Sequence, residues 1–144
     1  MRVHQILKSK SDDGVVTVPP GTSIADAAKV LAERGIGTVV VSADGSTAEG
    51  ILSERDIVRV LASKGGAILS DKVEAHMTSK LVTCGRGDDV DTVLGQMTQG
   101  RFRHMPVLED GQLAGLITLG DVVKARLSEL SMEKDALEGM IMGH

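Results

Sequence analysis

The sequence predicts an α/β fold of the mixed α+β class, built from two β-α-β-β-α repeats packed with pseudo-twofold symmetry. Three observations predict it: an internal duplication, apolar periodicity that alternates between strand and helix type, and a matched polar motif in each copy. A chain of 144 residues fits two small fused halves. We place them at 1–66, with an N-terminal lead-in, and at 67–144, with a C-terminal helical tail.

The duplication appears when the chain is aligned with itself. Residues 15–63 match residues 81–128 with a single-residue gap near Thr47, and Asp56 falls opposite Asp121. One copy alone would bury few residues around a three-stranded sheet. We therefore expect the two copies to pack into one body.

Each copy opens with a short strand and an amphipathic helix. In the first copy, the strand VVTV precedes a helix that Thr22 or Ser23 can cap and that Gly35 ends. In the second copy, LVTC precedes a helix that either Asp88 or Asp89 can cap. The apolar stripe of this second helix runs as far as Gly100, where we expect it to stop.

Two further strands and a second helix complete each copy. The strands TVVVS and GIL, and in the second copy HMPVLE and AGLIT, are separated by an Asp-Gly turn at 44–45 or 110–111. The second helix opens at Ser53 or Thr118. Short helical turns at 3–7 and 73–77 are expected to lead into the copies, and residues 124–144 to continue the last helix as a packing or partner-facing tail. These two lead-in sequences are VHQIL and VEAHM.

Composition excludes several classes of function. The chain has one Phe, no Trp or Tyr, and a net charge of -4, so nucleic acid is an unlikely partner. Cys84 is the only cysteine, which excludes an intramolecular disulfide and a thiolate metal cluster. The four histidines show no metal-ligand spacing, and no phosphate-binding glycine loop is present, so we predict no enzyme and no metal site. The lack of a signal peptide or long apolar run predicts a cytoplasmic protein without a membrane segment.

A hydroxyl and a carboxylate three residues apart begin the last helix of each copy. Ser53 with Asp56, and Thr118 with Asp121, fit a capping box. The same groups also fit a nucleotide, because helix N-termini attract phosphate and a carboxylate can accept hydrogen bonds from ribose hydroxyls. A glycine three residues earlier in each strand would let a base approach the backbone. Both interpretations remain open at the level of single motifs.

The paired stretches GILSERDIV and GLITLGDVV, together with RFRHMPVLEDGQLAGLITLGDVV, resemble a tandem pair of CBS domains over nearly the whole chain. The resemblance implies two clefts that bind adenosine-containing ligands. The first would be formed by Ser53, Asp56, Lys80, Val82, Phe102, Arg103 and His104. The second would be formed by Thr118, Asp121, Val16, Ile36, Gly37 and Thr38. Because the first alone contains Arg103 and His104, we expect it to prefer more phosphate.

The resemblance implies a sensor module without a required cofactor. Its ligand would be AMP, ADP, ATP, S-adenosylmethionine or NAD(H), with Mg²⁺ accompanying ATP, and the signal would pass to an unidentified partner protein. The family's usual assembly implies a homodimer. The alternative is an assembly module whose clefts are vestigial and whose tail makes the useful contact.

Overall fold

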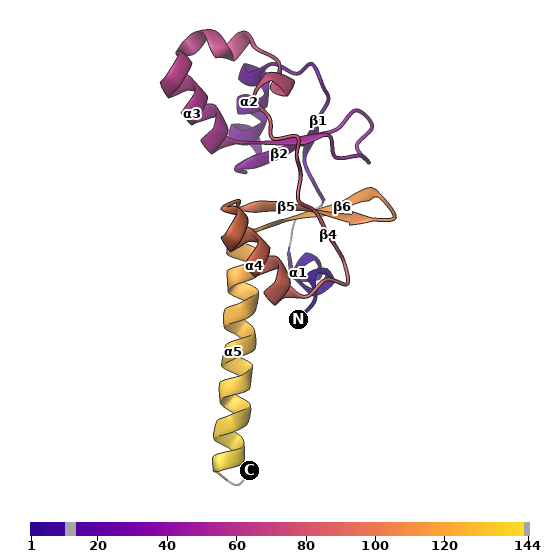
Figure 1. The fold of residues 1–144 in the computed structure, drawn as a ribbon, viewed down its shortest axis with the longest axis vertical. Helices are drawn as coiled ribbons and strands as arrows, with labels where there is room; N and C mark the ends of the chain where they lie inside the picture. The colour runs from indigo at the N-terminus through magenta and orange to yellow at the C-terminus, as the bar shows by residue number, and fades with distance from the viewer. Residues whose placement is uncertain (11–13, 143–144) are drawn as a thin grey trace.

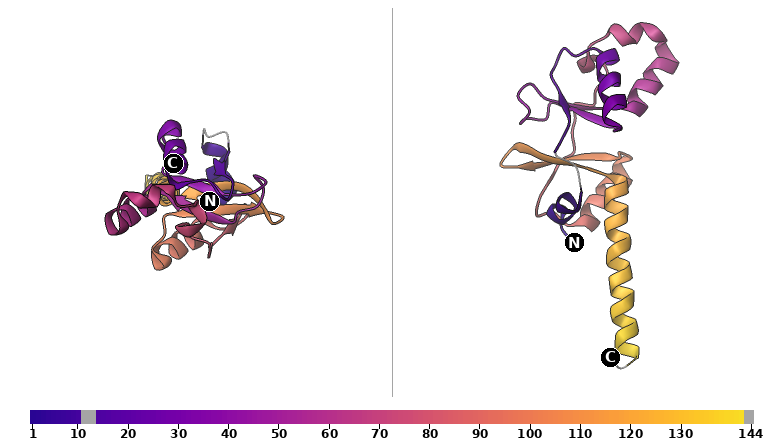
Figure 2. Two further views of the ribbon diagram at one scale, coloured as in Figure 1. Left: turned by 90° about the horizontal axis from the view of Figure 1, so that it is seen from above. Right: turned by 180° about the vertical axis from the view of Figure 1, so that it is seen from behind.

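Two three-stranded sheets lie face to face at the centre of the molecule, with helices on both outer sides (Figures 1 and 2). The structure is a computed structural model that describes residues 1–10 and 14–142. The two sheets have the same strand order and the same directions, since a parallel pair precedes an antiparallel hairpin in each. The predicted α+β fold of two repeats is therefore confirmed.

The first repeat contains one sheet and two long helices. Its elements are β1 (Thr17–Val18), α2 (Ile24–Arg34), β2 (Thr38–Val41), β3 (Gly50–Ser53) and α3 (Glu54–Lys64). The two short 3-10 helices η1 (Gly66–Ser70) and η2 (Val73–Ala75) follow. Ser23 caps α2 by accepting the Asp26 N–H at 3.0 Å, and Gly35 ends it at φ 63°, as the sequence predicts.

The second repeat contains the other sheet and the longest helix. Its elements are β4 (Cys84–Gly85), α4 (Val90–Gly100), β5 (His104–Glu109), β6 (Gln112–Thr118) and α5 (Leu119–Ile141). Asp110 and Gly111 both have positive φ, which confirms the predicted tight hairpin turn. One local prediction needs correction, because Asp89 occupies the N-cap of α4 without a side-chain cap bond. The helix ends at Gly100 as expected, and Arg101 follows it in the left-handed conformation.

Each repeat has its own hydrophobic core, and the face between the sheets is also buried. Val39 and Val41 belong to the core of the first repeat, whereas Val40 is fully buried but belongs to neither core. Because side chains alternate along a strand, Val40 and its neighbour Thr38 point toward the second sheet. The backbone also joins the halves, since the Leu113 N–H donates to Ser46 O at 2.6 Å.

The lead-in segments are exchanged between the repeats. The first lead-in forms α1 (Val3–Ser9), whose Val3 and Ile6 are buried in the core of the second repeat. The second lead-in, η2, contributes Val73 to the core of the first repeat. Each lead-in therefore packs against the other repeat and not against the one that follows it in sequence. The boundary between residues 66 and 67 stays a prediction.

The strand glycines make room for these lead-ins. A Cβ atom at Gly115 would lie 2.6 Å from Leu7 Cδ2, and one at Gly50 would collide with the Met77 side chain. The sequence interpretation gave this space to a ligand base. In the structure, Leu7 and Met77 fill it, so the glycines serve the packing of the lead-ins.

Candidate functional site

A complete capping box begins each helix that follows a hairpin. In α3, Ser53 Oγ accepts the Asp56 N–H at 3.1 Å, and Asp56 Oδ2 accepts the Ser53 N–H at 3.0 Å. In α5, Thr118 and Asp121 repeat the two bonds at 3.1 and 2.9 Å. The capping interpretation is therefore confirmed for both motifs. Since each carboxylate has a second oxygen, capping leaves acceptor capacity for a ligand.

Most backbone donors in the first turn of each helix already have a partner. The Glu54 N–H donates to Gly37 O and the Leu119 N–H to Arg103 O, both at 2.8 Å. The N–H groups of Arg55 and Gly120 remain, and the described residues supply no acceptor for either of them. These two donors lie at the positive ends of two helix dipoles, where an anion is favoured.

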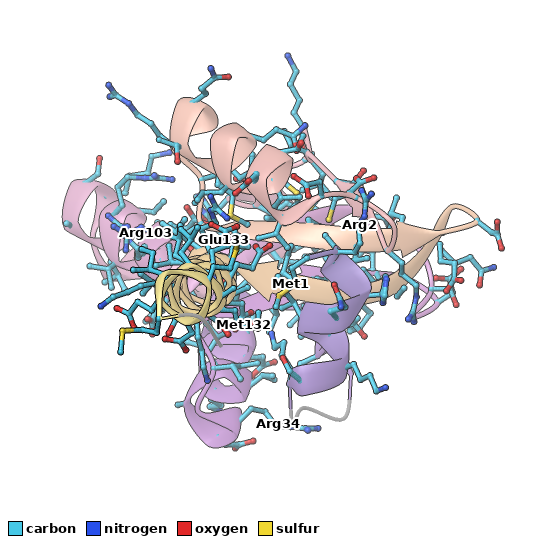
Figure 3. The ribbon with its side chains drawn as sticks, turned by 90° about the horizontal axis from the view of Figure 1, so that it is seen from below. Met1, Arg2, Arg34, Arg103, Met132 and Glu133 are labelled. Atoms are coloured by element: carbon cyan, nitrogen blue, oxygen red, sulfur yellow. The ribbon has the colours of Figure 1, made fainter. Side chains whose placement is uncertain are left out.

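Both helix starts open into one hollow of about 260 Å³. It is lined by Gly37, Ser53, Glu54, Arg55, Arg103, His104, Thr118, Leu119 and Gly120. In Figure 3, which looks along α5, Arg103 lies on the side of the molecule occupied by α3. Ligand pockets usually measure about 300 to 1,000 Å³. The hollow by itself therefore suits one part of a nucleotide, such as its phosphate, better than the whole.

The positive charge in this hollow comes from arginine. Burial lowers the pKa of His104 below its ordinary 6.5, and the positive charges of Arg103 and Lys10 act in the same direction. The Asp56 carboxylate opposes this shift without cancelling it. His104 is therefore neutral at pH 7 and serves as a hydrogen-bonding group, whereas the Arg103 guanidinium stays charged.

The two motif carboxylates have different cationic neighbours. Asp121 Oδ2 accepts a hydrogen bond from Lys10 Nζ at 2.9 Å. Asp56 Oδ1 pairs instead with Arg59 Nη2 at 3.1 Å, on the same helix, and the Arg59 side chain is 73% exposed. Burial raises the pKa of Asp121, but hydrogen bonds from Thr118 and Lys10 outweigh it, and the pKa lies below 3.8. This carboxylate therefore stabilises the fold above about pH 4, and the contribution is lost as the pH falls through the lowered pKa.

The model of the CBS domain family matches the chain twice, at residues 7–63 and 72–128. The chain belongs to the CBS domain family. Its two repeats form a CBS pair, as the resemblance of the sequence predicts.

Known CBS proteins share the fold over most of their length. A solved CBS-domain-containing protein of Agrobacterium tumefaciens is 47% identical with a TM-score of 0.81, and the match covers 88% of this chain and 99% of that one. A mitochondrial CBS domain-containing protein of Arabidopsis thaliana is 33% identical over 98% of this chain and 72% of its own length. A CBS domain protein of Pyrobaculum aerophilum, solved in complex with AMP, is 25% identical with a TM-score of 0.77; the match covers 92% and 99% of the two chains.

The structure gathers some of the predicted site residues and separates others. Five of them line the shared hollow, although the sequence divided them between two clefts: Gly37, Ser53, Arg103, His104 and Thr118. Four hydrophobic residues lie elsewhere. Val16 and Ile36 pack against the first core, Phe102 packs against the second, and Val82 is 42% exposed. The ligand-binding role of every one of these residues stays a prediction.

Thr38 has a buried hydroxyl that lacks a partner. The residue is 6% exposed, and Thr38 Oγ1 has no hydrogen-bond partner within the described residues. Thr38 lies opposite Ser53 in the β2–β3 register, just as His104 lies opposite Thr118 in the β5–β6 register. The two residues therefore occupy matching positions at the ends of the facing strands. An unpaired buried hydroxyl is costly, by about 1–3 kcal/mol, and marks a position where a ligand would be favoured.

Lys10 is not among the residues predicted for the clefts, although the sequence contains a signal that points to it. Residues 3–10 and 73–80 share a valine, an apolar residue four positions later and a final Ser-Lys pair. By this match Leu7 corresponds to Met77, and the two side chains do fill equivalent places beside the strand glycines. Lys10 thus corresponds to Lys80, which had been assigned to the first cleft. The internal repeat therefore includes the lead-ins.

Two kinds of feature are absent from the described ranges 1–10 and 14–142. None of the helices there has the length and apolar character needed to cross a bilayer. That part of the chain also holds no group of three or more His, Cys, Asp or Glu side chains suited to a metal ion.

Proposed function

We propose that this CBS pair is a regulatory module that binds an adenosine-containing ligand between its repeats and passes the signal to a partner protein. The observation that carries the proposal is the hollow in which both helix starts meet Arg103. Two unsatisfied N–H groups and a guanidinium favour phosphate there. The Asp56 carboxylate, whose partner Arg59 is exposed and can turn away, is suited to ribose hydroxyls.

Two further observations support an adenosine ligand. The Pyrobaculum aerophilum relative is described in complex with AMP, and its fold extends over 92% of this chain. The unpaired Thr38 hydroxyl offers a polar contact across from Ser53. We propose AMP, ADP, ATP, S-adenosylmethionine and NAD(H) as the candidate ligands, with Mg²⁺ accompanying ATP. The module binds its ligand without catalysing a reaction on it.

Isothermal titration calorimetry with AMP, ADP, ATP, S-adenosylmethionine and NADH tests the proposal. We expect saturable binding of at least one of them, because the hollow presents donors to an anion and the Asp56 carboxylate lies near His104 at its edge. Absence of saturable heat with all five compounds at millimolar concentration would leave the assembly alternative, in which the clefts are vestigial.

Replacing Arg103 with Ala is expected to weaken ATP binding more than adenosine binding. Arg103 lines the hollow and carries its charge at pH 7, whereas the lowered pKa of His104 leaves that ring neutral. A lost charge-assisted hydrogen bond corresponds to roughly a tenfold to hundredfold loss of affinity. The two ligands are compared by calorimetry. Arg34→Ala is the matched control, since Arg34 is exposed and lies away from Arg103 (Figure 3). Equal losses for ATP and adenosine would contradict the phosphate role.

We propose that the chain forms a homodimer through α5. This helix projects beyond the body of the molecule, and among its described residues only Val122 and Ala125 are buried (Figure 1). Apolar residues spaced three, four or seven apart form an exposed stripe along it: Val123, Leu127, Leu130, Leu137 and Ile141. Such a stripe on a protruding helix fits a second copy of itself.

Sedimentation equilibrium tests this assembly. We expect a dimer for the wild-type chain and a monomer for Leu127→Glu/Leu137→Glu, because two charges would be buried in the stripe. Met132→Glu is the control, since Met132 lies on the opposite side of the helix from the stripe and is 57% exposed. A monomeric wild-type protein would refute the homodimer.

A further inference from the structure

The exchanged lead-in brings a lysine to the carboxylate of the second repeat. Lys10 Nζ donates to Asp121 Oδ2 at 2.9 Å and to Leu116 O at 3.0 Å. The Lys10 and Asp121 side chains are 21% and 25% exposed, so the pair is sheltered from bulk water. Val3 and Ile6 anchor α1 in the core, and this anchoring holds the lysine in place. A sheltered pair of this kind is screened less than an exposed one.

Among the residues that the structure describes, the first repeat has no equivalent contact. Lys80, which corresponds to Lys10, is exposed, and the described residues place no carboxylate against it. In the first repeat, the lead-in contacts the strand through its backbone, since the backbone groups of Ile51 and Thr78 exchange hydrogen bonds at 3.0 and 2.9 Å. Ile51 corresponds to Leu116, whose carbonyl oxygen accepts a hydrogen bond from Lys10 in the second repeat. The partner of Asp56 is Arg59, an exposed residue three positions further along the same helix.

We propose that Lys10 blocks ribose binding at Asp121 in the second repeat, so that each chain takes one adenosine ligand, at Asp56. This inference rests on the proposed function. The Lys10 ammonium donates to Asp121 Oδ2, the oxygen that also accepts the Thr118 N–H, and its charge neutralises the carboxylate that a ribose would use. A ligand at Asp121 must therefore compete with a lysine that is only 21% exposed, whereas a ligand at Asp56 competes with Arg59, which is 73% exposed and is held more weakly. Lys10 is in this sense a specificity-determining residue.

The different surroundings of the two carboxylates support this assignment. The hydrogen bond and positive charge of Lys10 contribute to holding the pKa of Asp121 below its ordinary range. The lysine also lies close enough to lower the pKa of His104, which lines the shared hollow. The charge of Lys10 thus lowers the pKa of His104, at the hollow, as well as that of Asp121.

Equilibrium dialysis with labelled AMP tests the stoichiometry. We expect one AMP per wild-type chain, loss of that site in Asp56→Asn, and two AMP per chain in Lys10→Met. Lys8→Met is the matched control and should stay at one AMP per chain, since Lys8 is an exposed lysine of α1, the helix that Lys10 follows as its C-cap. Two AMP per wild-type chain, or one per chain in Lys10→Met, would overturn the inference.

A ligand-free measurement separates this inference from the proposed function. Lys10→Met should raise the pKa of Asp121, followed by carboxylate NMR, whereas Lys8→Met should leave it unchanged. An unchanged pKa in Lys10→Met would show that the lysine does not hold Asp121 in solution and would overturn the inference. Failure of AMP to bind any variant would count against the proposed function, and the titration would still decide on Lys10.

Discussion

Asp56→Asn is expected to weaken binding of the adenosine-containing ligand by roughly a hundredfold. In the proposed function, the Asp56 carboxylate accepts hydrogen bonds from the ribose hydroxyls. Two hydrogen bonds to a charged group contribute about 1.5 kcal/mol each, and a loss of about 3 kcal/mol corresponds to roughly two orders of magnitude in affinity. Asn keeps the size of the side chain but removes its charge and turns one acceptor into a donor. Calorimetry with AMP measures the effect.

The control must separate ligand contact from helix capping. Asp56 also caps α3, and loss of a cap costs about 1 kcal/mol of stability. Ser23→Ala removes the side-chain cap of α2 through the bond to Asp26 N–H, away from the hollow. We expect Ser23→Ala to lower the melting temperature and to keep the affinity for AMP. If Asp56→Asn lost no more affinity than Ser23→Ala, the ribose role of Asp56 would be wrong.

Gly115→Val is expected to destabilise the fold by about 1–3 kcal/mol and to detach α1, because it inserts side-chain atoms into a filled space. Gly115 is buried, and its Cβ would lie 2.6 Å from Leu7 Cδ2. Gly115 does not have positive φ, and valine suits a strand, so the cost comes from packing rather than from the backbone. Hydrogen exchange should show faster exchange of the α1 amides, while chemical denaturation measures the loss of stability.

Two variants control for this effect. Leu7→Ala in the Gly115→Val background opens space for the new methyl groups, so we expect it to restore part of the protection of α1. Gly50→Val faces Met77 in the first repeat and should leave exchange in α1 unchanged. Protection of α1 that survives Gly115→Val would contradict the role of this glycine in docking the lead-in.

Much of the fold could be predicted because its signals are local or repeated. The duplication predicted two matching units, and the structure has two sheets with the same strand order. Ser23, Gly35 and the Asp110–Gly111 turn act as predicted, because a cap or a turn depends on residues within a few positions. The sequence pattern did not point to Arg101, a non-glycine residue that adopts the left-handed conformation just after α4. Propensity favours glycine there without requiring it.

The candidate site could be predicted only in part. Asp56 and Asp121 were found as motif residues, and the structure confirms their capping role. The division into two clefts depended on how the sheets face each other, and the structure places Ser53 and Thr118 around one hollow. The glycines of both motifs were assigned to a ligand because their neighbours in space, the lead-ins, were not visible in the local pattern.

The sequence by itself determined the repeat, the local caps and the residue types at each helix start, since these depend on contacts between residues close along the chain. Tertiary structure alone decided that the lead-ins exchange places, and therefore that Lys10 reaches Asp121 across 111 positions of sequence. Such a contact depends on which apolar faces pack together in the folded chain. The periodicity of the sequence does not determine that pairing. The two carboxylates are alike in sequence and become different only in the folded chain.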